Sequence, residues 1–196
     1  MNPLPDLAAR ASPAELHRQA DAVSGQLAAD SLSSATPALM MILNRQRQIV
    51  YSNPAVLRIL NPPDPPLPRG LRPGEALHCS RAASAPSGCG TTPFCQTCGA
   101  FRAILSAQLG RPDMQECRIS STSGEALDLR VWSTPVTFHS EPYVLLSILD
   151  VGDEKRRRAL ERIFFHDIMN AAVGLRGLSD LMAKVPPDEA SRFRSM

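Results

Sequence analysis

Short apolar runs separated by polar residues dominate the middle of the chain, and this pattern predicts β-strands. The runs at 39–43 and 48–51 are joined by the polar residues 44–47, and two runs this close together predict a hairpin. Alternating or continuous apolar positions predict three further strands, at 114–120, 126–137 and 142–150. The chain is therefore expected to place two strands before, and three strands after, a less regular segment.

Helical patterns surround and separate these strands. Ser12 and Glu15 have the spacing of a capping box, which predicts a flanking helix that runs to about residue 29 and is only loosely anchored. Pro54 opens a short helix at 55–60, and another helix is expected at 100–109. Residues 61–68 hold five prolines and are expected to form a loop.

The last expected element is one long helix over 153–185. From Phe164 onward its apolar residues recur alternately three and four positions apart, which is the pattern of a coiled coil or helical bundle. A single helix with such a seam has nothing to bury it against. We therefore expect a homodimer in which this helix pairs with a second copy.

The order of these elements predicts an α+β domain, with an antiparallel sheet and helices on one side. The order, and the segment from Ile49 to Ala55, resemble the PAS family of sensor domains. The resemblance divides the chain into a flanking helix at 1–31, a PAS-like domain at 32–152 with a Cys-rich loop at 78–99, and a linker helix at 153–196.

Composition limits the possible partners and the location. The net charge of +2 and the 20% of charged residues are too balanced to favour nucleic acid as the main partner. No apolar stretch approaches the roughly 20 residues that span a bilayer. The first residues lack the pattern of a signal peptide, so we expect a cytoplasmic protein whose cysteines are reduced.

His166 lies on the long helix, away from the apolar seam, and is therefore expected to be exposed. With Asp167 and Asn170 it resembles the H-box of sensor histidine kinases. The resemblance implies that His166 accepts a phosphoryl group, that Asp167 orients the ring and takes its proton, and that Asn170 hydrogen-bonds near the reacting groups. Without the resemblance, His166 would be interpreted as an ordinary solvated surface histidine.

The resemblance also implies an ATP-binding kinase domain and a cognate response regulator as partners. The 196 residues leave no room for the kinase domain after the long helix, so this chain alone is not expected to phosphorylate itself. We predict the sensor module of a two-component histidine kinase. The alternative is a non-catalytic dimeric PAS signalling protein, or a protein that binds metal or responds to redox state.

Four cysteines, Cys79, Cys89, Cys95 and Cys98, lie within twenty residues and are flanked by glycines. Thiolates gathered in this way suit an iron–sulfur cluster or zinc, and the single Cys-x2-Cys knuckle favours the cluster. Redox-active thiols without a metal, and plain structural cysteines, are the alternatives. His78 is a possible substitute ligand, while Cys117 is expected to be a small core residue and His139 a loop residue.

Overall fold

The computed structural model describes residues 6–26, 36–60 and 68–184, and it divides the chain into two compact units that meet at Gly152. The first unit holds all the strands and the short helices, and the second is a long helix. We describe each unit by itself. The predicted proline-rich loop at 61–68 lies almost entirely outside the described residues.

The first unit is built on one antiparallel sheet of five strands in the order β2-β1-β5-β4-β3. The strands form where the apolar runs predict them: β1 Leu39–Leu43, β2 Ile49–Ser52, β3 Asp113–Ser120, β4 Ala126–Phe138 and β5 Glu141–Asp150. The last strand pairs with the first, so the two hairpins close into one sheet. The prediction of a PAS-like α+β fold is confirmed.

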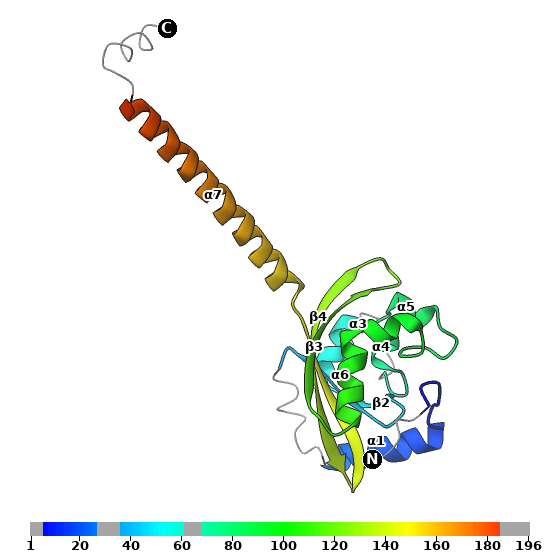
Figure 1. The fold of residues 1–196 in the computed structure, drawn as a ribbon. Coiled ribbons are helices and arrows are strands. Elements are labelled where there is room, and N and C mark those ends of the chain that lie inside the picture. The colour runs from blue at the N-terminus through cyan, green and yellow to red at the C-terminus, as the bar shows by residue number, and fades with distance from the viewer. Residues whose placement is uncertain (1–5, 27–35, 61–67, 185–196) are drawn as a thin grey trace. The chain divides into compact units, whose positions relative to one another are not determined.

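Helices connect and cover this sheet (Figure 1). They are α1 Pro13–Gln26, α3 Pro54–Leu60, α4 Pro73–Ala76, α5 Ser80–Ala83, the 3-10 helix η1 Pro93–Thr97, and α6 Gly99–Gln108. The segment 78–99, predicted to be a loop, therefore contains two short helices. Pro93 occupies the first turn of η1, where its missing N–H costs nothing.

The main core lies between one face of the sheet and the helices α3, α4 and α6 (Figure 1). Alternate residues of β1 and β5 point into this core, and α3, α4 and α6 contribute apolar residues from the helical side. Its members on β1 and β5 include Leu39, Met41, Leu43, Leu146 and Ile148, all buried. This core provides the scaffold on which the Cys-rich segment is held.

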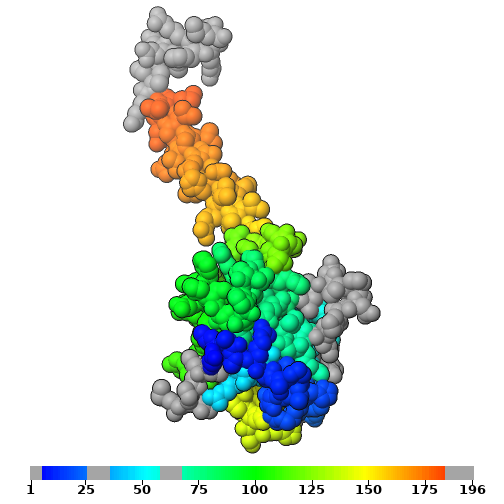
Figure 2. Space-filling view, turned by 90° about the vertical axis from the view of Figure 1, so that its right-hand side faces the viewer, coloured from blue at the N-terminus to red at the C-terminus, as the bar shows by residue number. Residues whose placement is uncertain are grey.

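The helix α1 packs on the opposite face of the sheet. Leu16, Ala20 and Val23 follow each other at helical spacing, and Ala20 and Val23 are completely buried. Val23 joins a second apolar cluster with Ile42 and Val50 of the sheet. The expectation of a loosely anchored helix is therefore wrong. The helical spacing of these apolar residues is visible in the sequence, but only the fold shows which face of the sheet they pack against. The first described residues lie against the domain as well (Figure 2).

The turn of the first hairpin lacks glycine, and a side chain takes over its role. The side-chain Oδ1 of Asn44 accepts a hydrogen bond from the Gln48 backbone N–H at 2.9 Å, while its side-chain amide donates to the Gln19 side chain of α1 at 2.8 Å. Arg47 adopts a left-handed conformation with φ of 64°. Such a conformation is uncommon in residues other than glycine, so the buried hydrogen bonds of Asn44 hold the turn in place.

The second unit is the helix α7, which spans Gly152–Lys184. This confirms the long C-terminal helix that the heptad pattern predicts. Its first turns carry ion pairs between residues three or four apart, such as Arg156 with Asp153 and Arg157 with Glu161. The basic run at 155–158 therefore lies among acidic residues of the same helix. Among the described helices, none is both long and apolar enough to cross a membrane.

Candidate functional site

The structure offers two places where chemistry-bearing side chains gather: His166 with its neighbours on α7, and the cysteines of the sensor unit. The imidazole of His166 is 71% exposed, as its position away from the seam predicts. A nucleophile in this position is accessible to a separate protein domain.

Asp167 and Asn170 both reach the ring of His166. The Asp167 Oδ1 atom lies 3.3 Å from Nδ1, and the Asn170 amide nitrogen lies 3.2 Å from Nδ1 and 3.4 Å from Nε2. Asn170 is one helical turn beyond His166, which explains the contact. When Asp167 accepts a hydrogen bond from Nδ1–H, the lone pair remains on Nε2, and that nitrogen becomes the nucleophile.

The seam residues of α7 are exposed in the single chain. Phe164, Leu175, Leu178 and Met182 are each at least 60% exposed. Exposed apolar residues this large and regular are typical of a surface that binds a partner. The helix thus presents the seam on one side and His166 on another.

The second site is a cavity of about 440 Å³ between the short helices and the sheet. All five cysteines of the chain line it: Cys79, Cys89, Cys95, Cys98 and Cys117. The four cysteines of the Cys-rich segment are thus brought to one cavity, as their clustering suggests. The fifth, Cys117, comes from β3.

The sequence predicts Cys117 to be a small core residue and not a member of the cluster. Cys117 does pack against the main core, but it also lines the cavity. The alternation of residues along the strand is the sequence signal for this position of Cys117. Gln115, Cys117 and Ile119 share the less exposed face of β3. That face is the one covered by α6.

A buried arginine and a carboxylate hold the cysteine-bearing loops. Arg72 is completely buried and donates hydrogen bonds to the carbonyl oxygens of Cys89 at 2.9 Å, Ala9 at 2.8 Å and Gln46 at 3.2 Å. Burial lowers the pKa of Arg72 below its ordinary value, and the nearby Arg10 lowers it further. Three separate segments thus meet at one guanidinium.

Glu75 completes this arrangement from α4. Its carboxylate accepts hydrogen bonds from the backbone N–H of Arg72 at 3.0 Å and of Cys89 at 3.1 Å, and it pairs with Arg10. Burial alone would raise the pKa of Glu75, but these hydrogen bonds outweigh it and leave the pKa below its ordinary value. The carboxylate therefore stays ionised at neutral pH.

Arg47 is a second buried arginine at the cavity. One of its amino groups donates to the Leu7 carbonyl oxygen at 2.7 Å, and its guanidinium lies 5.5 Å from the centre of the Phe101 ring. Its Nη1 group is buried and has no hydrogen-bond partner among the described residues. Burial lowers the pKa of Arg47 to about 10.

Cys98 and Cys117 both line the cavity. Cys98 precedes the first residue of α6, and a hydrogen bond with the Cys117 side chain is the main cause of the shift in its pKa. The hydrogen bond lowers the pKa of Cys98 and raises the pKa of Cys117. The backbone N–H groups of Phe101 and Ala100, at the positive end of α6, lower the pKa of Cys98 further.

Cys89 has the opposite environment. Burial raises its pKa to about 12, so it is a neutral thiol at pH 7. A Cβ atom at Gly74 would lie 2.7 Å from the Cys89 sulfur and 3.5 Å from the Cys79 Cβ atom. Glycine is required at position 74 because these two cysteines pack directly on it.

The side chains at the cavity are also the potential ligands of a metal ion. Within the described residues, no three His, Cys, Asp or Glu side chains are close enough together to hold one. The Cys95 thiol instead contacts the Thr92 hydroxyl at 3.1 Å, and His78 is exposed and does not line the cavity. The iron–sulfur cluster, with Cys79, Cys89, Cys95 and Cys98 as ligands, stays a prediction. His139 lies in the turn after β4, as expected.

No family model and no curated protein matches the sequence. Solved structures that resemble the chain include the PAS domain of nitrogen regulation protein NR(II) from Vibrio parahaemolyticus. This domain has 16% identity and a TM-score of 0.43, with 62% of this chain and 95% of that chain covered.

The light-oxygen-voltage (LOV) protein of Rhodobacter sphaeroides has 16% identity and a TM-score of 0.43, with 69% and 68% covered. The PAS domain of BvgS from Bordetella pertussis has 15% identity and a TM-score of 0.36, with 72% and 94% covered. At such low identities and TM-scores, the likeness carries no argument about function. The PAS-like fold rests on the sheet order and helix placement described above.

Proposed function

We propose that this chain is the sensor part of a two-component system, in which α7 carries the phosphoacceptor His166. The observation that carries the proposal is the exposed imidazole, with Asp167 and Asn170 within 3.3 Å of Nδ1. A separate ATP-binding kinase domain supplies the phosphoryl group, and a response regulator receives it. The resemblance of residues 165–170 to an H-box supports the same assignment.

The neighbours of His166 suit nucleophilic attack on ATP. Asp167 accepts a hydrogen bond from Nδ1–H and so keeps the lone pair on Nε2. The Nε2 atom attacks the γ-phosphorus, a nitrogen–phosphorus bond forms, and the bond to the bridging oxygen breaks as ADP leaves. Asp167 takes the Nδ1 proton and balances the charge that develops on the ring. The Asn170 amide nitrogen lies 3.4 Å from Nε2, so it must leave this lone pair free before Nε2 attacks.

Dimerisation of α7 completes the proposal. The exposed seam, which includes Phe164, Leu175 and Leu178, would be buried against a second copy of this helix. A paired helix has discrete registers, so a change at the sensor unit can alter how His166 is presented. The sensor input is proposed to act in the cavity, where the unpaired Nη1 of Arg47 offers a donor to a carbonyl or carboxylate group.

A phosphotransfer assay tests the proposal. The full chain is mixed with ATP, magnesium and an isolated histidine-kinase ATP-binding domain, and phosphate that is acid-labile and alkali-stable is measured. The H166Q variant is expected to lose this phosphate. The D167N variant is expected to be slower by roughly 10²-fold, because it loses the proton acceptor. Equal labelling of H166Q and the wild-type chain would refute the assignment.

The cysteine-lined cavity favours a second candidate function, a metal or redox sensor. Five thiols on one cavity are the specific observation, although the described residues show no metal-binding geometry. Anaerobically purified protein tests the iron–sulfur prediction directly. Iron, labile sulfide and visible absorption are expected if the cluster is present, and colourless protein with zinc alone would exclude it.

A further inference from the structure

We propose that the cavity of the sensor unit binds a small monocarboxylate with an apolar body, and that the Arg47 guanidinium holds its carboxylate. The proposal names the chemical class of the input, and its role as a signal rests on the sensory function proposed above. Binding itself does not depend on His166, so it is measured separately from phosphotransfer.

Arg47 is a buried cation whose hydrogen bonds are incomplete. Only 2% of the residue is exposed, and one of its amino groups donates to the Leu7 carbonyl oxygen at 2.7 Å. The other amino group, Nη1, is buried and has no hydrogen-bond partner among the described residues. A buried polar group without a partner costs free energy, and a charged one costs more. An acceptor that enters the cavity would remove this cost.

Arg72, the second buried arginine at the cavity, shows that the fold can satisfy such a group. Each nitrogen of its guanidinium donates to a backbone carbonyl oxygen, and the acceptors are Gln46, Ser87, Cys89 and Ala9. The fold therefore engages every nitrogen of Arg72, whereas it leaves one amino group of Arg47 unengaged. This difference identifies Arg47 as the arginine that suits a ligand.

The charges around the cavity favour an anionic ligand. Four arginines line it, namely Arg47, Arg72, Arg81 and Arg118. Glu116 is the only acid among the described lining residues, and its carboxylate pairs with Arg130 at 2.9 Å. Positive charge therefore exceeds negative charge in the lining, and a negatively charged ligand would offset the difference.

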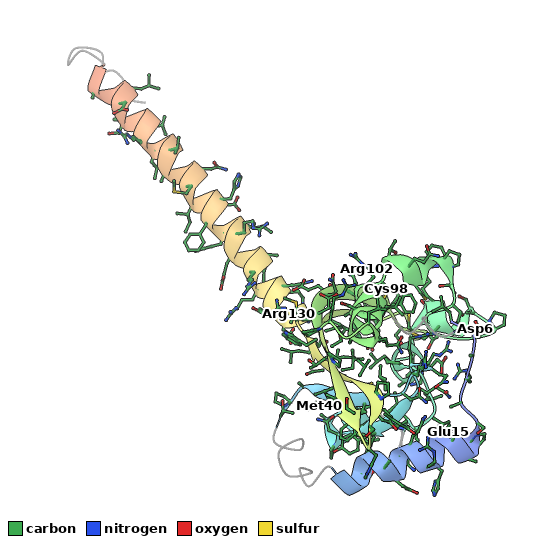
Figure 3. The ribbon with its side chains drawn as sticks, turned by 60° about the horizontal axis from the view of Figure 1, so that its bottom comes forward. Asp6, Glu15, Met40, Cys98, Arg102 and Arg130 are labelled. Atoms are coloured by element: carbon green, nitrogen blue, oxygen red, sulfur yellow. The ribbon has the colours of Figure 1, made fainter. Side chains whose placement is uncertain are left out.

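The size and the walls of the cavity indicate an apolar body behind the carboxylate. Its volume of about 440 Å³ lies within the range of small-molecule pockets, roughly 300–1,000 Å³. Leu77 and Ile104 line it on the helical side, and Leu129 and Ile148 line it on the sheet. Figure 3 places Cys98, which also lines the cavity, in the helical layer over the sheet.

A carboxylate suits this site better than a phosphate. The unpaired Nη1 group carries two N–H donors and one buried positive charge, which match a single carboxylate. A phosphate brings up to two negative charges and more acceptor oxygens than one amino group can satisfy. The apolar walls would leave those additional oxygens without partners.

Calorimetric titration of the full chain tests the ligand class with three probes: octanoate, 1-octanol and inorganic phosphate. Octanoate is expected to bind saturably, with one molecule per chain. Octanol has the same chain length but no charge, so it is expected to bind at least roughly tenfold more weakly. Absence of octanoate binding, equal binding of octanol, or tighter binding of phosphate would overturn the proposal.

Methyl NMR of the wild-type chain locates the bound octanoate. The signals of Ile104 and Ile148, which line the cavity, are expected to shift during the titration. Ile163 and Ile168 are exposed on α7 and report on adhesion to that helix, so their signals are expected to stay in place. Shifts confined to the α7 residues would overturn the proposal.

Variants test the role of Arg47. R47M is expected to bind octanoate at least roughly tenfold more weakly and to lose the preference over octanol. Arg111 is exposed and does not line the cavity, so R111Q is the matched control and is expected to bind octanoate like the wild type. Equal octanoate binding by wild type and by R47M that circular dichroism shows to be folded would overturn the proposal.

Two controls keep the outcome clear. The comparison of probes and the methyl mapping use the wild-type chain, so they decide even if R47M does not fold. H166Q is expected to bind octanoate like the wild type. Octanoate binding without phosphate on His166 would therefore refute the phosphotransfer role alone, and the reverse result would refute only the carboxylate site.

Discussion

Two thiols in one cavity show how strongly the surroundings of a single residue change its chemistry. The hydrogen bond from Cys117 lowers the pKa of Cys98 below its ordinary value of 9.0, whereas burial raises the pKa of Cys89 to about 12. Both residues are cysteines of the same loop region, and the sequence alone does not distinguish them. Their contrast follows from the Cys117 hydrogen bond and the helix end at Cys98, and from the burial of Cys89.

This contrast predicts a difference in alkylation with pH. Because a lowered pKa yields thiolate at lower pH, Cys98 is expected to react with iodoacetamide at pH 7, while Cys89 is expected to stay largely unreacted at pH 8. Mass spectrometry after timed quenching measures both sites in one sample. Faster alkylation of Cys89 than of Cys98 in the folded chain would contradict the described environments.

Glu75 predicts a second residue-scale effect. The E75Q variant replaces a carboxylate that accepts hydrogen bonds from Arg10, Arg72 and Cys89, so it is expected to lower the free energy of unfolding by about 1–3 kcal/mol at pH 7. Because the folded-state pKa is lowered, this stabilisation is present above the ordinary value of 4.5 and is lost as the pH falls below it.

Urea unfolding of both chains at pH 7 and at pH 3.5 checks this account of Glu75. The difference between wild type and E75Q is expected to shrink at the lower pH. Glu125 is exposed in the turn before β4, and E125Q is therefore a matched control with little expected change. A constant difference at both pH values would show that the charge of Glu75 does not provide the stabilisation.

Some residue positions could be predicted from the sequence, and others could not. The exposure of His166 could be predicted, because helical periodicity alone sets which side it faces. The buried positions of Arg47 and Arg72 could not, since their carbonyl partners come from segments distant in sequence. The membership of Cys117 in the cavity depends in the same way on which helix covers its strand.

At the scale of elements, the proposed dimer interface along the seam of α7 can be tested by substitution. Replacing Leu175 and Leu178 with aspartate places two charges in the proposed dimer interface, so the chain is expected to become monomeric. Val173 is similarly exposed, at 65%, but lies off the seam, and V173D is the matched control that keeps the dimer. Sedimentation velocity measures the assembly. A monomeric wild-type chain, or a dimer that persists after both leucines are replaced, would contradict the proposed dimer interface.

The packing of α1 gives a second prediction for an element. Val23 is completely buried against the sheet, so V23A is expected to destabilise the chain by roughly 1–2 kcal/mol through the lost methyl groups and the cavity left behind. Ser24, the next residue, is exposed, and S24A is expected to have a small effect. Chemical unfolding that reports equal stability for V23A and wild type would contradict the packing.

Elements differ in how well their patterns predict them. The five strands follow from apolar periodicity, because each strand buries one or both of its faces. The short helices within 78–99 do not, since they are too short to show a period, and the loop between them is held at Cys89 by hydrogen bonds with Arg72 and Glu75. The hairpin turn at 44–47 forms without glycine because Asn44 supplies the hydrogen bonds.

At the scale of the whole molecule, the chain joins a PAS-like unit to a long helix at Gly152. The order of the predicted elements was sufficient to anticipate this arrangement. The proposed function depends on the helix after the sensor unit, which carries an exposed histidine within reach of an acid and an amide. The central claim is therefore about which histidine receives phosphate.

Site mapping of phosphate tests this claim most directly. After incubation of the full chain with ATP and a histidine-kinase ATP-binding domain, peptides are prepared at alkaline pH and analysed by mass spectrometry. The account predicts phosphate on His166, and none on His17, His78 or His139. Phosphate on one of those three histidines, or none on the folded chain under conditions that label a known histidine kinase, would contradict the account.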